Sequence, residues 1–474
     1  MEIIIHPLSM FSRQIAQGLP QYFQTFPAIL MLIYSTYLVG KKGNGFDLRF
    51  GVGIVFFVIL LLFTQAIASL RTILSFPITG VGIFDKYVQF ILLIIYITLA
   101  YFFMKNALDT EQRIVNFFKG VYLTCAFILL IVFAQLAFIQ FGWFYSILYW
   151  LREVFGQDAY SDANNLYLIR GGVEYLRSFR QPNGLDPESR DVAIRLALTC
   201  LPFMLAAFRN RLSFKGSTRL GNTIHTLSIL LTVFALFFLA TATGYAIGML
   251  TAIIFVLFVL KPRVEKSQSV KKIIVLIVFA MSVLLLFMYF GTIQVFFTNY
   301  FFAREGSGNR RASAIALWRT FIQHPLIGVG FDFSSPWNIL NAPANWANNP
   351  VNIHIYLASG TLPALSVFLG WLAELGLVAI LPILGYFLRV KIDFTMLVER
   401  LEKTNVSTWQ KKFYSTINDA YFLFIIYFIP VSFLLFDWEG LSYILVVMFF
   451  IVTKAYLLNL LETIAPIGEK GEEV

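Results

Sequence analysis

Two adjacent arginines open the stretch of sequence with the clearest capacity for chemistry. Arg310 and Arg311 follow a turn-forming run at residues 306–309, in which Ser307 or Asn309 could cap a helix that begins here. The N-terminus of a helix already carries partial positive charge, so two cations in its first turn are unfavourable unless an anion neutralises them. Free backbone N–H groups and guanidinium forks together make a good phosphate site. The alternative is that both arginines only contact lipid headgroups.

The helix behind this arginine pair is expected to end near Pro325, because the residue before a proline avoids the α-helical region. Gly328 and Gly330 follow, and they permit a tight return of the chain. Arg319 lies on the same helix and is a weaker candidate for binding the same anion.

A second basic group lies earlier in the chain. Arg177, Arg180 and Arg190 flank a turn marked by proline, asparagine and glycine at residues 182–184. These cations also require an anionic partner. It is either a bound anion or the neighbouring carboxylates of Asp186, Glu188 and Asp191.

Two other side chains could transfer or hold a proton. His354 has a side chain that titrates near neutral pH, although a structural histidine in a loop is equally compatible with the sequence. Glu374 lies inside a long apolar run, where an ionisable group is costly and is therefore a candidate for function or for pairing with an arginine. No Asp-X-Asp pair accompanies Asp332, so hard oxygen ligands are scarce. We expect neither a metal nor a cofactor.

The elements that position these residues follow from composition. Of the 474 residues, 58% are hydrophobic and 13% are charged, against about 25% charged residues in soluble domains. A chain of this size cannot bury so much apolar surface in one soluble core. We therefore predict an all-α, polytopic integral membrane bundle with about eleven, and between ten and twelve, transmembrane helices.

The apolar segments long enough to be spans can be placed along the chain, since a span needs roughly 20 residues. They lie at residues 23–39, 51–70, 87–104, 117–139, 192–208, 224–241, 243–260, 273–290, 363–388, 418–437 and 441–459. The first is the least certain, because residues 1–22 could hold an interfacial helix. The two cysteines, Cys125 and Cys200, fall inside spans and are expected to be packing residues.

Basic residues set the expected orientation. Lysines and arginines cluster after the first, fifth, seventh and ninth spans, which all fall on one side, and the positive-inside rule makes that side cytoplasmic. The net charge of +10 is explained in this way and does not indicate a nucleic-acid partner. The C-terminus is then cytoplasmic. The resulting units are N-terminal helices (1–139), a first outer loop (140–191), central helices (192–290), a large outer loop (291–362), and C-terminal helices with a tail (363–474).

The combination of motifs resembles a known family. The chain carries the pair Arg310–Arg311, then Trp318, then HPLIGVG at residues 324–330 and LGWLAELGLVAIL at residues 369–381. The earlier RSFRQPNG, residues 177–184, precedes a span. This pattern is similar to that of the O-antigen ligase and O-antigen polymerase superfamily.

The resemblance implies a polysaccharide polymerase of the bacterial inner membrane. Such an enzyme transfers glycan from an undecaprenyl-pyrophosphate-linked oligosaccharide to an acceptor glycan hydroxyl at the outer face, in O-antigen, capsule or exopolysaccharide synthesis. Arg310, Arg311 and Arg177, with Arg180 and Arg319 as weaker candidates, would stabilise the developing pyrophosphate charge. His354 would be the base. Loop 291–362 would be the catalytic loop, membrane lipids would surround the enzyme, and a chain-length regulator protein is a possible partner.

Two alternatives remain. Ligases open the segment before the second motif with a His-Asn pair, where this chain has Leu365 and Ser366, so the resemblance favours a polymerase over an O-antigen ligase. The other alternative is a flippase or transporter of lipid-linked oligosaccharide. Transporters usually contain broken helices and inverted repeats, and the sequence contains no evident repeat.

Overall fold

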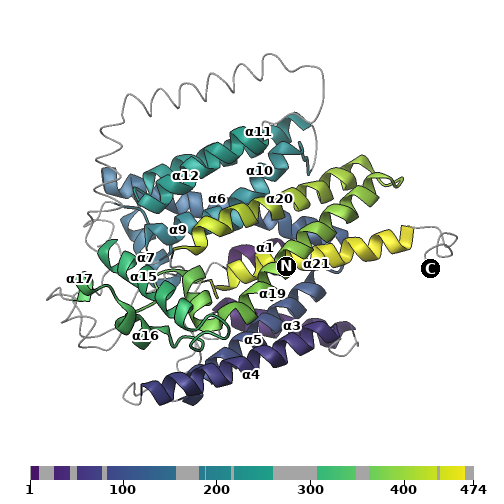
Figure 1. Ribbon diagram of the computed structural model, residues 1–474. Coiled ribbons are helices and arrows are strands. Elements are labelled where there is room, and N and C mark those ends of the chain that lie inside the picture. Colours follow the sequence, from purple (N-terminus) through teal and green to yellow (C-terminus); the bar gives the residue numbers. More distant parts are fainter. Residues whose placement is uncertain are drawn as a thin grey trace.

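A computed structural model describes residues 2–9, 26–42, 51–76, 83–155, 181–186, 188–214, 218–259, 307–347, 362–434 and 438–464. Every regular element within these segments is a helix (Figure 1). Nine of the helices in the described segments are long and apolar enough to cross a membrane. The protein is therefore a polytopic all-α membrane protein, as the composition predicts.

Nine described helical segments coincide with nine of the eleven predicted spans. Of the other two, residues 273–290 lie outside the described part of the chain, and residues 23–39 coincide with a helix whose apolar stretch, Ala28–Gly40, is shorter than a full span. The long helices before the family motifs are α3 (Phe26–Lys42), α4 (Val52–Ser75), α5 (Ile83–Ala107), α6 (Glu111–Phe141), α9 (Ser189–Arg195), η1 (Leu196–Cys200), α10 (Leu201–Arg209), α11 (Thr218–Phe238), α12 (Ala242–Ile254) and η2 (Phe255–Val259). Those after them are α19 (Val367–Glu402), α20 (Thr408–Ser432) and α21 (Leu441–Ile464).

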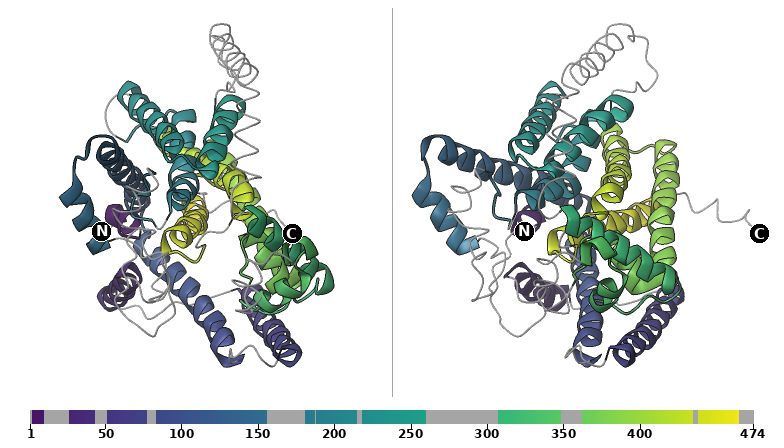
Figure 2. Two further views of the ribbon diagram at one scale, coloured as in Figure 1. Left: turned by 90° about the vertical axis from the view of Figure 1, so that its left-hand side faces the viewer. Right: turned by 60° about the vertical axis from the view of Figure 1, so that its left-hand side comes forward.

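The bundle has a clear centre and a clear periphery. Among the described spans, the segment Ser189–Arg209, which comprises α9, η1 and α10, is the most enclosed. Of its apolar stretch 89% is buried, whereas the corresponding share of α4 is 28%. Phe203 in this central segment stacks on Phe450 of α21 at a centroid distance of 5.3 Å. Helix α4 lies at the edge of the bundle (Figures 1 and 2), so one of its faces is left for lipid.

Contacts between helix ends agree with the predicted alternation of the spans. Gln181 donates to the carbonyl of Ala240, which joins two segments predicted at the outer face. Gln410 donates to the carboxylate of Glu111, which joins two helix starts predicted at the cytoplasmic face. The assignment of these two ends to the two sides of a membrane remains a prediction.

The described residues of segment 1–22 include a helix that packs into the bundle. Helix α1 (Glu2–Leu8) lies against α6, with the His6 side chain fully buried and its Nδ1 2.6 Å from Thr124 Oγ1. Cys125 and Cys200 are buried free thiols, as expected for packing residues.

The described parts of the two outer loops are mainly helical. Helix α7 (Tyr145–Phe155) follows α6, and α15 (Ser307–Gln323), α16 (Ser334–Asn341) and α17 (Ala344–Ala347) precede α19. The structure confirms the predicted helix before Pro325, but α15 begins at Ser307, so residues 307–309 belong to the helix and not to the predicted turn. In Figure 2 the green helices α15 and α16 lie beside the purple-blue α4, which brings two distant parts of the chain together.

Candidate active site

Helix α19 is broken at Gly376, inside the LAELG motif. The backbone there has φ +70° and ψ −179°, a conformation that side-chain-bearing residues rarely adopt. A Cβ atom at this position would lie 2.4 Å from the carbonyl oxygen of Leu326. Glycine is therefore required both by the conformation and by the close approach of the HPLIGVG segment.

The HPLIGVG segment supplies the hydrogen bonds that the broken helix lacks. Four backbone bonds join the two motifs: Val329 N–H to Ala373 O (2.9 Å), Gly330 N–H to Glu374 O (3.0 Å), Leu377 N–H to Pro325 O (2.8 Å) and Val378 N–H to Leu326 O (3.0 Å). Non-helical backbone within a membrane protein is tolerated only where protein groups or water satisfy it. The two motifs are therefore one structural unit.

The glycines of HPLIGVG make the tight return predicted from the sequence. Gly328 and Gly330 have φ of +66° and +103°. A Cβ atom on Gly328 would lie 2.2 Å from the carbonyl oxygen of Glu374, so the backbones of the two segments are in direct contact here.

Side chains of α4 hold the other edge of the HPLIGVG segment. Gln65 is fully buried; its Oε1 accepts from the amide of Phe331 at 2.9 Å and its Nε2 donates to the carbonyl of Ile327 at 3.3 Å. Thr72 donates to the carbonyl of Val329 at 2.5 Å.

Our reading of the sequence missed these residues. The signal was present, because Gln65, Ser69 and Thr72 recur at helical spacing on one face of an otherwise apolar span. Such a polar stripe indicates a polar partner.

Glu374 lies at the centre of this unit. Its side chain is 9% exposed, and its Oε1 accepts a hydrogen bond from Ser334 Oγ at 2.7 Å. The sequence left open that Glu374 pairs with an arginine of the outer loop. Among the described residues, its carboxylate instead contacts Ser334. Asp332, the adjacent acid, forms an ion pair with Lys86.

His324 is the first residue of the HPLIGVG segment, and it packs edge-on against Trp337, with the ring centroids 4.4 Å apart. Burial, and then the positive charge of Arg71, lower the pKa of His324 below its usual value. Its imidazole is therefore neutral at physiological pH. Trp337 is fixed in turn by a hydrogen bond from its Nε1 to Thr72 Oγ1 at 3.0 Å.

The predicted arginines of α15 lie along one helix. Arg310 and Arg311 are exposed in its first turn, and Arg319, further along, donates to the carbonyl of Asn341 at 3.1 Å. Asn309 accepts a hydrogen bond from Trp346 at 2.8 Å inside the helix, so it does not act as the predicted cap. At 1.5 Å per residue, about 20 Å of helix separates Arg311 from the HPLIGVG segment. The arginine pair therefore lies at the start of α15, whereas Glu374 of α19 lies beside the HPLIGVG segment that follows the end of α15.

Three predicted site residues, Arg177, Arg180 and His354, lie outside the described residues, and their roles stay predictions. Arg190, from the same basic group, pairs with Glu188 at 3.5 Å and with Asp191 at 3.3 Å. For this arginine, the salt-bridge alternative is confirmed.

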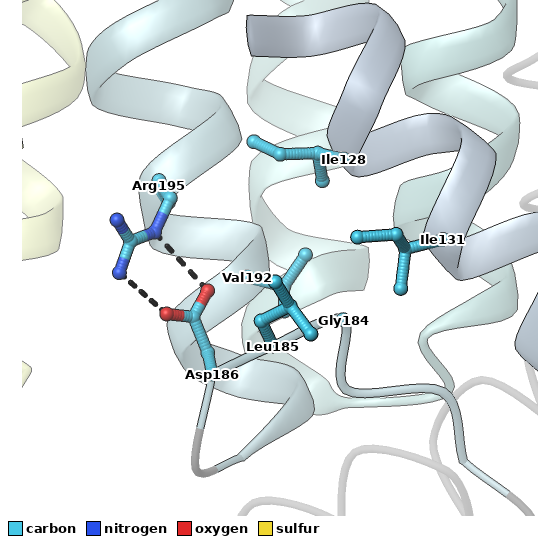
Figure 3. A pocket seen from close by; sticks show the side chains of 7 residues that line it. All are labelled: Ile128, Ile131, Gly184, Leu185, Asp186, Val192 and Arg195. Carbon is cyan, nitrogen blue, oxygen red and sulfur yellow. Dashed lines mark hydrogen bonds and ion pairs between the residues drawn. The ribbon is translucent and has the colours of Figure 1, made fainter. Parts of the chain in front are cut away.

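The turn that follows Arg180 is held inside the bundle. Gln135 of α6 accepts hydrogen bonds from the amides of Asn183 (2.9 Å) and Gly184 (2.8 Å). Figure 3 shows the next contact, in which Asp186 points to Arg195 of α9 and the two form a buried ion pair, with Nε 3.1 Å from Oδ2. The cavity that these residues line beside α6 has room for about one water molecule. It is too small to hold a substrate.

One comparison with known proteins identifies a related family, and no curated protein matches the chain. The family model described as O-Antigen ligase matches residues 227–384. This range contains α15, the HPLIGVG segment and the break in α19, whereas α4 lies outside it. The match supports a function of the O-antigen ligase and polymerase type in a multi-pass membrane protein. Residues 227–384 are thus similar to the O-antigen ligase family, and this likeness supports placing the chain in the O-antigen ligase and polymerase superfamily.

Proposed function

We propose that the protein is a polysaccharide polymerase that transfers glycan from an undecaprenyl-pyrophosphate-linked oligosaccharide to a sugar hydroxyl of an acceptor glycan. The reaction would take place at the outer face of a bacterial inner membrane. The carrier diphosphate is the leaving group, so the main task of the protein is to stabilise negative charge as the sugar–phosphate bond breaks.

The observation that carries this proposal is the exposed face of α15. Arg311 lies at the start of that face, and Trp318 and Ile322 follow it at positions i+7 and i+11, all three exposed. Leu326, just beyond the helix, continues the exposed apolar surface. A cation followed by an apolar strip is complementary to a diphosphate followed by a polyprenyl chain.

The helix is well placed to hold this surface still. Ser313, on its buried side, donates to the carbonyl of Pro363 at 2.9 Å and accepts from the amide of Leu365 at 3.0 Å. The far end of the helix leads into the HPLIGVG segment, which is bonded to α19. Because both ends are anchored, the arginine pair keeps a fixed position relative to the membrane helices, as electrostatic stabilisation of a transition state requires.

A proton must also leave the acceptor hydroxyl. His354 and Glu374 are the candidates for accepting it, on the chemistry of their side chains. We further propose that the reaction needs no metal, since the charge on the leaving group is met by arginines.

The test uses a strain whose surface polysaccharide depends on this protein. Arg310, Arg311, Arg177 and His354 are replaced singly by alanine, and Arg311 also by lysine, which keeps the charge but loses the bidentate fork. Loss of one stabilising donor should lower the amount of long-chain polysaccharide by about 100-fold. If all four alanine variants make full-length chains at normal abundance, the site assignment is wrong.

One observation favours a second candidate, a flippase of the same lipid-linked oligosaccharide. Broken membrane helices are typical of transporters, and α19 is broken at Gly376. Reconstituted vesicles separate the two candidates: a polymerase lengthens added lipid-linked oligosaccharide, whereas a flippase moves a fluorescent analogue across the bilayer without lengthening it.

A further inference from the structure

Arg71 of α4 differs from the other buried or half-buried arginines of the described helices. Each of those has a carboxylate partner: Arg113 with Asp109, Arg190 with Asp191, Arg195 with Asp186, and Arg209 with Asp419. Among the described residues, Arg71 has none, and its Nη2 donates only to the neutral carbonyl of Gly328. A half-buried cation in a membrane helix is costly without an opposite charge. An anion from outside the chain would supply it.

Arg71 lies where such an anion could arrive from the lipid. The exposed apolar side chains of α4, among them Phe63, Leu70 and Leu74, form one face, and the buried side chains, among them Gln65 and Thr72, form the opposite face. At 3.6 residues per turn, Arg71 falls on the boundary between these faces. Helix α4 ends one turn later, at Ser75, so the guanidinium lies near the end of the span, at the depth of lipid headgroups.

A second polar group beside Arg71 also lacks a partner. The Nε of Arg71 and the Nε2 of His324 are both buried and make no hydrogen bond to any described residue. Burial lowers the pKa of His324 and so favours the neutral ring, and in the tautomer that carries its proton on Nε2 this atom can donate to an anion without adding a second charge. The Trp337 ring, bonded to Thr72, fixes the imidazole in place.

We infer that Arg71 and His324 form a binding site for a phosphate group carried by a membrane lipid, separate from the surface at Arg310 and Arg311. A guanidinium fork matches the oxygens of phosphate, and the boundary position on α4 favours a phosphate whose lipid chain lies along the exposed face. About 20 Å of helix separates the two sites, which is more than one diphosphate can span. The protein can therefore hold two lipid-borne phosphates at once.

Native mass spectrometry of the purified full-length protein in detergent tests this inference. The protein is titrated with undecaprenyl diphosphate and, separately, with phosphatidylglycerol. Arg71→Gln keeps a donor for the carbonyl of Gly328 but loses the charge, so the local fold is preserved while the anion site is removed. Arg71→Lys keeps the charge without the fork, and His324→Phe keeps the ring packing without Nε2. Arg389→Gln, on an exposed cation of α19, is the matched control.

The wild type and Arg389→Gln should bind two undecaprenyl diphosphates. In Arg71→Gln the affinity of one of these two sites should fall about tenfold or more, with smaller losses in Arg71→Lys and His324→Phe. An equal loss of affinity for phosphatidylglycerol would assign the site to bulk lipid headgroups. A loss of affinity confined to undecaprenyl diphosphate would assign it to a polyprenyl carrier.

Unchanged affinity of Arg71→Gln for both lipids would overturn the inference. Only the assignment to a polyprenyl carrier rests on the proposed function. That function fails on a different result, namely absence of glycan transfer by the wild type, so the two failures can be told apart.

Discussion

At the scale of single residues, the site depends on side chains that the family motifs only partly reveal. Glu374 could be singled out from the sequence, because a carboxylate inside an apolar span is unusual. The partner of Glu374 could not be predicted, because Ser334 is 40 positions away and belongs to a short helix that only the tertiary structure brings near. Arg71 and Gln65 were missed for a related reason. The polar stripe on α4 indicates a polar partner, but a hydrophobicity pattern does not show which segment of the chain its side chains contact.

Glu374→Gln tests whether the carboxylate has a chemical role. Glutamine keeps an oxygen that accepts from Ser334 and keeps the volume of the side chain, so folding should be little affected. If the carboxylate accepts the proton of the acceptor hydroxyl, glycan transfer should fall by about 100-fold or more. Transfer by purified protein is measured together with its melting temperature. Equal transfer by the variant and the wild type would leave Glu374 a structural residue.

Gln65→Leu tests the contribution of α4. The substitution leaves the amide of Phe331 and the carbonyl of Ile327 without their partner in a buried place, which should cost about 1–3 kcal/mol for each group. Thermal unfolding in detergent measures this loss of stability. Gln112→Leu, at an exposed position of α6, is the control and should change stability little. A variant as stable as the wild type would show that α4 does not hold the HPLIGVG segment.

At the scale of elements, the interlock of α19 with the HPLIGVG segment is the main feature that positions the site. Both motifs could be found in the sequence, and the turn at Gly328 and Gly330 was predicted from its glycines. The break in α19 was not, because a glycine inside a helix costs only about 1 kcal/mol and an apolar run around Gly376 is equally typical of a continuous span. The conformation is decided by the HPLIGVG segment, which packs into the break and lies about 50 residues earlier in the sequence.

Two glycines of the same helix provide a matched test of this interlock. Gly376→Ala places a methyl group 2.4 Å from Leu326 O at a positive φ, so it should destabilise the protein by several kcal/mol and lower its yield in the membrane. Gly385→Ala places the methyl group in open space within the helix and should be neutral or stabilising by about 1 kcal/mol. Yield and melting temperature are compared. Similar behaviour of the two variants would contradict the interlock.

At the scale of the whole molecule, composition and span length were enough to predict a polytopic helical bundle. They could not predict which helix is central and which is peripheral, since α4 and the segment Ser189–Arg209 are both strongly apolar. The difference arises from packing against several partners at once, as with Phe203 between α6 and α21. The orientation in the membrane rests on the distribution of basic residues.

Cysteine labelling tests that orientation. The native thiols are buried, so single added cysteines report on the surface. Leu340→Cys, at an exposed position of α16, should react with a membrane-impermeant maleimide in cells whose outer membrane has been permeabilised. Asn405→Cys, between α19 and α20, should react only after the inner membrane is also opened. The reverse pattern would place Arg311 on the cytoplasmic side and contradict the proposed reaction.

The central claim is that Arg311 stabilises the diphosphate of a lipid-linked glycan donor, and glycan transfer by the purified protein measures it most directly. Protein reconstituted in vesicles is given undecaprenyl-diphosphate-linked oligosaccharide in the presence of EDTA, and product length is followed over time. We predict chain extension by the wild type and by Arg389→Gln, a reduction of about 100-fold in Arg311→Ala, and an intermediate rate in Arg311→Lys. Chain extension by Arg311→Ala at the wild-type rate would contradict the account.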